Sequence, residues 1–231
     1  MDWIGLAAGQ VPVLRVNNMT ATVAAQISLV TGLTIEGLSY SYKGLRVFAD
    51  FSLHSERKIV VLRGPSGCGK TTLLKLLSGN LEPTSFASKP STAGSCLVLQ
   101  EDSLFPWLSG TENILHVTKI QLAEFENHPM YRLIAAFVSR KACQMSYGQR
   151  RMVELFRAIL FRPKYLYLDE PFNFLDGAKA KSVVPFLQGE FMEDTTLVMS
   201  NHHHDDPSLL SAASVFEFDG EFPITSLRRT K

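Results

Sequence analysis

The chain has 231 residues, a length that suits one α/β domain with room for a small subdomain. Hydrophobic residues make up 45% and charged residues 19%, which is ordinary for a globular protein, and the formal net charge is +1. A charge so close to neutral produces no global field that would attract nucleic acid or an anionic membrane surface, so net charge gives no argument for either partner. The three cysteines form an odd set without paired spacing, which indicates free thiols in a reducing, cytoplasmic setting.

No segment is expected to cross a membrane. The longest charge-free run, residues 16–35, contains Asn17, Asn18 and Gln26, and this polar content disfavours insertion. Asp2 stands near the start of the chain where a secretory signal would carry Lys or Arg. We therefore expect that any membrane association of this chain depends on another protein.

The first 32 residues are rich in Ala, Val and Thr, nearly uncharged and without a clear period. They are an extra strand, a disordered extension, or sequence upstream of a start at Met19, and no chemistry is expected of them. Residues 33–42 then alternate as a strand does, and residues 47–53 are the expected antiparallel partner. Lys43 and Gly44 would form the turn between these two strands.

Residues 59–77 combine an apolar strand, a glycine-rich loop and an amphipathic helix beginning near Lys70. The loop GPSGCGKTT fits G-x-x-x-x-G-K-[ST], the phosphate-binding P-loop, whose glycines let the backbone N–H groups surround an anion. Lys70 would reach the β- and γ-phosphates, and the Thr71 hydroxyl would hold Mg²⁺. The predicted nucleotide-binding residues here are Gly64, Pro65, Ser66, Gly67, Cys68, Gly69, Lys70, Thr71 and Thr72.

The middle of the chain alternates between loop, strand and helix. Residues 82–94 are rich in Pro, Ser and Thr and predict a loop, and residues 95–99 predict a short strand that leads to Gln100. Residues 111–144 have helical character with a break near residues 128–129. This pattern indicates a small helical subdomain.

A helix is expected over residues 146–161, with Arg162-Pro163 as its stop. Ser146 and Gln149 form an S-x-x-Q capping box, so one interpretation is an ordinary helix cap. The other is an anion-binding helix terminus that offers the Ser146 hydroxyl and the Gly148 N–H.

A hydrophobic strand over residues 164–168 delivers two carboxylates at its carboxyl end, where an open α/β sheet binds ligands. Beside a P-loop, Asp169 would hold Mg²⁺ and Glu170 would polarise an attacking water as general base. The alternative is a strand that merely ends in solvated acids. Further on, a helix is expected over 179–192, a strand over 196–199, a helix around Leu209 and a strand over 215–218. Alternating strands and helices predict an α/β fold with a mainly parallel sheet.

Five pieces of this sequence, in order, resemble the motifs of the nucleotide-binding subunit of ATP-binding cassette (ABC) transporters. They are GPSGCGKTT at 64–72, Gln100 after a strand, MSYGQRR at 145–151, YLYLDEP and NFLD at 165–176, and a strand ending in His202. The resemblance covers residues 33–220 and implies a P-loop NTPase with an N-terminal antiparallel β-subdomain and an inserted α-helical subdomain. It also implies ATP and Mg²⁺ as cofactors.

The resemblance further implies a role for each matching residue. Tyr42 resembles the aromatic residue that stacks on adenine, and Gln100 the glutamine that senses Mg²⁺, the γ-phosphate and the membrane partner. His202 resembles the switch histidine at the γ-phosphate, and Asp176 the aspartate at the dimer interface. Ser146, Gly148 and Gln149 resemble the signature segment, which contacts ATP bound by the other subunit. The expected catalytic residues are Glu170, His202, Gln100 and Lys70, and the expected Mg²⁺ ligands are Thr71, Gln100 and Asp169.

The sequence departs from the family pattern at the signature and at the switch. Tyr147 stands where the family usually has Gly, and Met145 where it has Leu. The Tyr147 side chain would lie close to the partner's ATP. Three consecutive histidines, at 202–204, favour His202 as the switch, with His203 as the alternative. A metal site made of all three is disfavoured, because neighbours in sequence rarely converge on one ion.

The segment LFPWLSGTENI at 104–114 and DEPFNFLD at 169–176 are most similar to ATPases of importers for nitrate, sulfonate, taurine and related solutes. Phe105, Pro106 and Trp107 are expected to form an exposed apolar patch where a permease docks. The alternative is that Trp107 packs into the helical subdomain. The transported solute is chosen by the permease, so this chain does not disclose it.

The resulting hypothesis is an ATPase subunit, paired with a second copy or another ABC subunit, on the cytoplasmic face of the membrane. It would couple ATP binding and hydrolysis to a separate transmembrane permease, with no nucleic acid partner. The alternatives are a soluble ABC-type ATPase and a slow nucleotide-gated module. The expected divisions are an extension at 1–32, the ABC ATPase domain at 33–220 with a helical subdomain at about 104–160, and a tail at 221–231.

Overall fold

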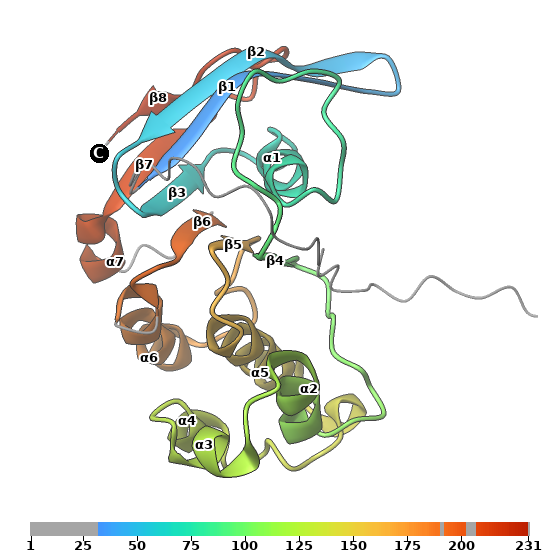
Figure 1. Ribbon diagram of the computed structural model, residues 1–231, viewed down its shortest axis with the longest axis vertical. Coiled ribbons are helices and arrows are strands. Elements are labelled where there is room, and N and C mark those ends of the chain that lie inside the picture. Colours follow the sequence, from blue (N-terminus) through green and yellow to red (C-terminus); the bar gives the residue numbers. More distant parts are fainter. Residues whose placement is uncertain (1–31, 190–191, 202–206, 231) are drawn as a thin grey trace, which may run out of the picture.

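The computed structural model describes residues 32–189, 192–201 and 207–230 (Figure 1). Two strands form an antiparallel pair, and six strands form a second sheet in the order β4-β5-β6-β3-β7-β8. The first pair is β1 (Leu33–Tyr42) and β2 (Leu45–Ser55). The second sheet contains β3 (Ile59–Arg63), β4 (Ser95–Val98), β5 (Tyr165–Leu168), β6 (Thr196–Ser200), β7 (Ala213–Glu217) and β8 (Arg228–Arg229). Strands β4, β5, β6, β3 and β7 are parallel, and β8 is antiparallel to β7.

The helices follow the strands in the alternating order that a parallel sheet requires. They are α1 (Lys70–Leu77), α2 (Gly110–Thr118), α3 (Leu122–Asn127), α4 (Tyr131–Ile134), α5 (Tyr147–Leu160), α6 (Gly177–Gln188) and α7 (Pro207–Ala212), with a 3₁₀ turn at Ala142–Gln144. The α/β fold with a mainly parallel sheet, an antiparallel β1–β2 pair and a separate group of helices is confirmed.

Two hydrophobic cores lie on opposite faces of the central sheet. Val60 and Leu62 of β3 join one core, with α1 and the β1–β2 pair, whereas Val61 joins the other, with α5 and α6. The alternation follows from the two-residue period of a strand. In Figure 1, α1 accordingly lies between the β1–β2 pair and the central sheet, and α2–α4 extend beyond α5 at the far end of the molecule. The helical group packs on α5 through buried side chains such as Ile114 and Ile134.

The strand register brings three carboxyl ends together. In β6, Ser200 pairs with Leu62 of β3, while Met199 pairs with Leu168 of β5. The residues that follow β3 and β5 therefore emerge at the same edge of the sheet, on either side of β6. This edge is where the residues of the predicted site gather.

Two segments differ from the sequence-based expectation. Helix α6 begins at Gly177 and not at Lys179, because the Asp176 side chain accepts a hydrogen bond from the Lys179 N–H and caps the helix there. It ends at Gln188, before Gly189, and not at Met192. Residues beyond 220 also contribute to the folded core: Ile224 is buried, and its N–H donates to the Val47 carbonyl of β2.

Candidate nucleotide-binding site

The glycine-rich loop connects β3 with α1, as the sequence predicts. Gly64, Gly67 and Gly69 have φ of 140°, 78° and 103°, values that residues with a Cβ rarely adopt. Gly64 is also closely packed, because a Cβ there would lie 2.7 Å from the Cβ of Phe218. At Gly67 a Cβ would meet nothing within 4 Å, so this glycine is required for its backbone conformation and not for space.

Lys70 begins α1 and folds back over the loop. Its ammonium donates to the carbonyl oxygens of Gly64 and Pro65, both at 2.8 Å, and the residue is only 5% exposed. Its positive charge therefore lies at the loop, which is where the P-loop motif needs a cation to meet phosphate oxygens.

Asp169, which follows β5, is 4% exposed and joins the P-loop to β6. Its Oδ2 accepts a hydrogen bond from Thr71 Oγ1 at 2.7 Å, and its Oδ1 accepts one from Ser200 Oγ at 2.6 Å. The structure thus brings together Thr71 and Asp169, two of the three residues that the sequence analysis assigns to Mg²⁺. Sequence reasoning missed Ser200, although its place at the end of a predicted buried strand was the available signal.

Glu170 adopts a left-handed conformation, with φ of 47°. Its N–H donates to Ser200 Oγ at 2.9 Å, and its carboxylate accepts a hydrogen bond from the Asn173 side chain. Glu170 is partly exposed, unlike the neighbouring Asp169. The two acids therefore have different environments, as a division into metal ligand and base requires. Asn173 was also missed, because only the turn after β5 brings it back to Glu170.

Tyr42 and Gln100 both lie on the surface. Tyr42 ends β1 with 55% of its surface exposed, and the Lys43 ammonium is 5.4 Å from the centroid of its ring. Gln100 follows β4 and is exposed. Both side chains are therefore accessible to a ligand.

The signature segment forms the N-terminus of α5. Ser146 accepts a hydrogen bond from the Gln149 N–H at 3.3 Å and donates its own N–H to the Gln149 side chain at 2.9 Å, so the capping box is present. Ser146 is nevertheless exposed. Ser146 and Gln149 therefore cap the helix, and the Ser146 end of the helix is still exposed to solvent.

Tyr147 is 63% exposed and packs against its own chain. Its ring lies 5.4 Å from that of Phe174, and the Arg150 guanidinium carbon is 4.3 Å from its centroid. A Cβ at Gly148 would lie 2.7 Å from the Phe174 carbonyl oxygen, so glycine permits this close approach of α5 to the loop before α6. The aromatic pair joins the signature segment to residues 173–176, a contact that the sequence did not predict.

Asp176 is exposed and pairs with the Lys179 ammonium at 2.6 Å. The hydrogen bonds from the Lys179 side chain and N–H lower the pKa of Asp176 below its usual value. The predicted switch residues, His202 and its alternative His203, lie outside the described residues, as does the rest of the 202–206 segment. Within the described ranges, no group of three or more His, Cys, Asp or Glu side chains is arranged to hold a metal.

The segment after Gln100 exposes an apolar surface. Trp107 is 60% exposed, Pro106 is exposed, and the Phe105 ring contacts those of Trp107 and His116 at centroid distances of 5.7 and 6.1 Å. Of the two alternatives for Trp107, the structure has the exposed side chain and not one packed inside the helical group. The cysteines are all free, with Cys68 and Cys96 buried, and burial raises the pKa of the Cys96 thiol to about 12.

Comparison with known proteins identifies the family. Residues 49–173 match the ABC transporter family. The chain is 32% identical over 190 residues to an aliphatic sulfonates import ATP-binding protein of Rhodococcus jostii, with 79% of this chain and 77% of that protein covered. It is 30% identical over 222 residues to a thiamine import ATP-binding protein of Photorhabdus laumondii, with 86% and 92% covered. The chain belongs to the ABC transporter family.

Solved structures agree with the fold. An ATP-binding subunit of an ABC transporter superposes with a TM-score of 0.73 at 19% identity, over 87% of this chain and 90% of that one. A dimeric ATP-binding cassette in a post-hydrolysis state with ADP and Pi superposes with a TM-score of 0.70 at 19% identity, over 86% and 98%. The predicted family is therefore confirmed, and the chain is an ATP-binding and ATP-hydrolysing subunit of an ABC transporter. Among the described residues, no helix is both long and apolar enough to span a membrane.

Proposed function

We propose that this ABC ATPase uses Mg²⁺-ATP to drive solute uptake through a separate membrane permease. The observation that carries the proposal is the convergence of Thr71, Asp169 and Ser200 at one sheet edge beside the Lys70 ammonium. The relatives named above are import ATP-binding proteins. A third, a spermidine/putrescine import ATP-binding protein of Spiroplasma citri, is 31% identical over 209 residues, with 81% of this chain and 59% of that protein covered. These names favour uptake over the soluble and slow-module alternatives.

The residues at the sheet edge fit Mg²⁺. Thr71 offers a hydroxyl oxygen, Asp169 a carboxylate and Gln100 an amide oxygen, and oxygen ligands of this kind are those that Mg²⁺ prefers. Bound Mg²⁺ would neutralise charge on the β- and γ-phosphates. The Asp169 carboxylate accepts hydrogen bonds from the Thr71 and Ser200 hydroxyls, and these hold it in place. Glu170, held by Asn173, is the proposed general base for the attacking water.

The remaining family roles are proposed on the same basis. Tyr42 would stack on adenine, Gln100 would respond to the γ-phosphate, and His202 or His203 would act as the switch. Ser146, Gly148, Gln149 and Asp176 would meet the ATP and interface of a second ABC subunit. Support comes from the solvent exposure of Ser146 and Asp176 in the single chain. The domain division into 1–32, 33–220 and 221–231 and the position on the cytoplasmic face belong to the same proposal.

Substitution of Ser146 tests the role in trans. Ser146→Arg is expected to leave Mg²⁺-ATP binding to the single subunit within about threefold of the parent, while ATP-dependent dimers are lost because a long cation occupies the exposed helix end. The measurement is size-exclusion chromatography with and without ATP. Ser146→Ala controls for the lost cap, which is worth about 1 kcal/mol of helix stability. Ser139→Arg places the same charge on an exposed turn. A Ser146→Arg variant that still dimerises with ATP would contradict the assignment.

The exposed segment Phe105–Trp107 is the proposed permease contact. Because buried Trp side chains contribute heavily to interfaces, Trp107→Ala is expected to weaken association with the permease roughly 30-fold. ATP hydrolysis by the subunit alone should stay within about twofold, since Trp107 lies outside the nucleotide site. Phe86→Ala, at a side chain 49% exposed on the 82–94 loop, is the matched control. Equal permease recovery with both variants would rule out this docking surface.

Purification from native membranes in mild detergent tests the transport function as a whole. The expected result is recovery of the chain with a transmembrane protein whose presence changes its ATP hydrolysis. Recovery with ribosomes or DNA and no membrane protein would overturn the transport function in favour of a soluble ABC ATPase. Stable ATP-dependent dimers without hydrolysis, even with the permease present, would favour the slow nucleotide-gated module.

A further inference from the structure

Arg151, in the first turns of α5, is 3% exposed and uses its whole guanidinium group. Nε donates to the Pro171 carbonyl at 3.0 Å, and Nη2 donates to the Asp169 and Glu170 carbonyls at 2.7 and 3.0 Å. Nη1 donates to the Leu99 carbonyl at 2.6 Å and to Glu154 Oε2 at 3.3 Å. A guanidinium has five N–H donors, and this one makes five hydrogen bonds. Four of its five partners are backbone carbonyls from two different loops.

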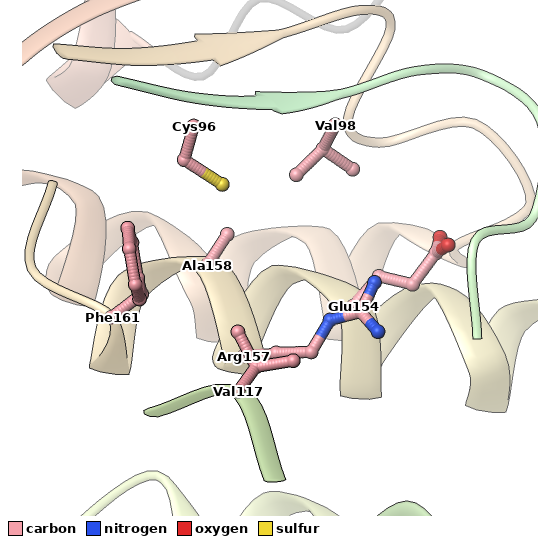
Figure 2. Close-up of a pocket in the computed structure, with 7 residues that line it drawn as sticks. All are labelled: Cys96, Val98, Val117, Glu154, Arg157, Ala158 and Phe161. Atoms are coloured by element: carbon pink, nitrogen blue, oxygen red, sulfur yellow. The ribbon is translucent and has the colours of Figure 1, made fainter. Parts of the chain in front are cut away.

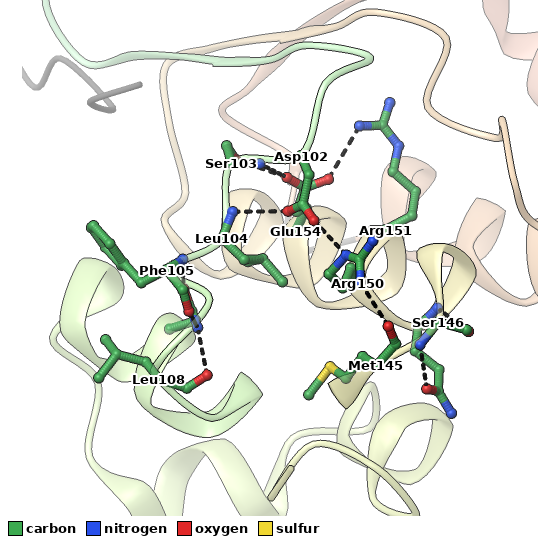
Figure 3. A network of polar contacts seen from close by, with 12 residues as sticks. Asp102, Ser103, Leu104, Phe105, Leu108, Met145, Ser146, Arg150, Arg151 and Glu154 are labelled. Carbon is green, nitrogen blue, oxygen red and sulfur yellow. Dashed lines mark hydrogen bonds and ion pairs between the residues drawn. The ribbon is translucent and has the colours of Figure 1, made fainter. Parts of the chain in front are cut away.

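The loop after β4 is fastened to the same part of α5. Glu154, 2% exposed, accepts hydrogen bonds from the Ser103 N–H at 2.5 Å and the Ser103 hydroxyl at 2.9 Å. Arg157 donates to the Ser103 hydroxyl at 2.6 Å, and Arg150 pairs with Asp102. Figure 3 shows the contacts of Ser103 with Glu154 and of Asp102 with Arg150, and Figure 2 shows Arg157 extending toward Glu154 below β4.

Glu154 and Arg151 form a buried ion pair. Burial raises the pKa of the Glu154 carboxyl, and the charge of Arg151 opposes that change. Because Glu154 supplies a negative charge next to the guanidinium, it reduces the cost of burying the cation. Its other oxygen binds Ser103, so the pair also joins the loop after β4 to the loop after β5.

The loop after β5 needs such a partner. Three successive carbonyls, of residues 169–171, point toward one guanidinium, while Glu170 has a φ of 47° that non-glycine residues seldom adopt. Carbonyl dipoles that converge on one point repel one another, and charge-assisted hydrogen bonds from a guanidinium offset this repulsion, so Arg151 stabilises this unusual turn. The conformation of this loop determines the direction of the Glu170 side chain.

We propose that Arg151 is a positioning residue for ATP hydrolysis: its guanidinium holds the 169–171 turn in the conformation that aims Glu170, and Glu154 holds the guanidinium. The inference rests on the proposed role of Glu170 as general base. It also connects the segment around Gln100 with the base. Leu99 and Ser103, on either side of Gln100, bind Arg151 and Glu154 of α5, and Arg151 in turn binds the Glu170 carbonyl.

We call the hydrogen bonds from Arg151 to the carbonyls of residues 169–171 the clamp. Hydrogen exchange of the full-length chain without nucleotide tests the clamp directly. In Arg151→Met, the amides of residues 169–174 are expected to exchange at least about tenfold faster, because the turn loses the hydrogen bonds to its three carbonyls, while P-loop amides 64–72 stay unchanged. Arg140→Met, at an exposed arginine in the helical group, is the control. Unchanged exchange at 169–174 would overturn the clamp even in a chain that hydrolyses no ATP.

Kinetics then test whether the clamp acts on Glu170. In Arg151→Met, kcat for ATP is expected to fall roughly 10- to 100-fold, since misplacement of a catalytic group by about 1 Å has effects of this size. The dissociation constant for Mg²⁺-ATP should stay within about threefold, which separates positioning from loss of binding. In a Glu170→Gln background, Arg151→Met should lower the residual rate by less than about threefold. An equal loss in both backgrounds would overturn positioning through Glu170.

Two further results keep the inference separate from the proposed function. Arg151→Lys retains the charge with three donors in place of five, so it should fold and lose about tenfold in kcat. Parent-level kcat and exchange in Arg151→Lys would show that charge alone suffices and would overturn the multidentate clamp. If Glu170→Gln hydrolyses ATP at the parent rate, the proposed base is wrong, whatever Arg151 does to exchange.

Discussion

Lys70→Ala is expected to abolish nucleotide binding, with the dissociation constant for Mg²⁺-ATP raised by about 100-fold or more. In the structure the Lys70 ammonium lies over the loop, 2.8 Å from each of two carbonyl oxygens, Gly64 and Pro65. Phosphate oxygens carry more negative charge than these carbonyls, so the cation has a stronger partner when ATP binds. Removal of the cation leaves the phosphates with backbone N–H groups alone, and hydrolysis is expected to fall below detection.

The measurement is titration calorimetry with ATP and Mg²⁺. Lys75→Ala is the matched control, because Lys75 lies on the same helix, in its last turn. The control should bind ATP as the parent does, and both variants should unfold at the parent temperature within a few degrees. ATP affinity in Lys70→Ala equal to that of the parent would contradict the role of this residue.

Glu170→Gln is the second substitution with a large expected effect. It should lower kcat by roughly 10²- to 10⁴-fold, the range for loss of a general base, while Mg²⁺-ATP still binds. Glutamine keeps an oxygen that can accept the hydrogen bond from Asn173, so the side chain should retain its position and lose only its basicity. Because bound ATP is no longer consumed, ATP-dependent dimers should also persist for longer than in the parent.

Single-turnover hydrolysis and size-exclusion chromatography measure the two effects on one sample. Glu126→Gln, an exposed glutamate on α3, makes the same chemical change away from the site and should behave as the parent. A Glu170→Gln variant with parent-level kcat would remove Glu170 as the base. A variant that neither hydrolyses nor binds ATP would point instead to damage of the binding site.

Local signals in the sequence accounted for the main elements of the nucleotide site. The P-loop pattern predicted a loop between strand and helix, and residues 59–63 and 70–77 form those elements. The capping box at Ser146 also predicted the start of α5. In both cases the determining interactions are short-range: glycine conformations, helix capping and the spacing of apolar residues along a strand. Each of these features involves only a few consecutive residues, so it can be recognised without knowledge of the fold.

Other features depend on residues that are far apart in the chain. Thr71 and Asp169 are 98 positions apart, and their contact could be expected only because both follow parallel strands. The hydroxyl of Ser200 between them depends on β6 lying between β3 and β5, an order that sequence spacing does not reveal. The exposure of the Trp107 side chain likewise depends on how the helical group packs, which the sequence alone does not reveal.

The sequence by itself thus determined the fold class, the phosphate-binding loop and the two acids at the end of β5. Only the tertiary structure decided that Asn173 holds Glu170, that Tyr147 stacks on Phe174, and that Arg151 binds the carbonyls around both acids. The reason is physical: a sequence motif consists of the residues that contact the ligand. The partners that hold those residues in place are selected by strand order and by the path of turns, and these arise from packing of the whole chain.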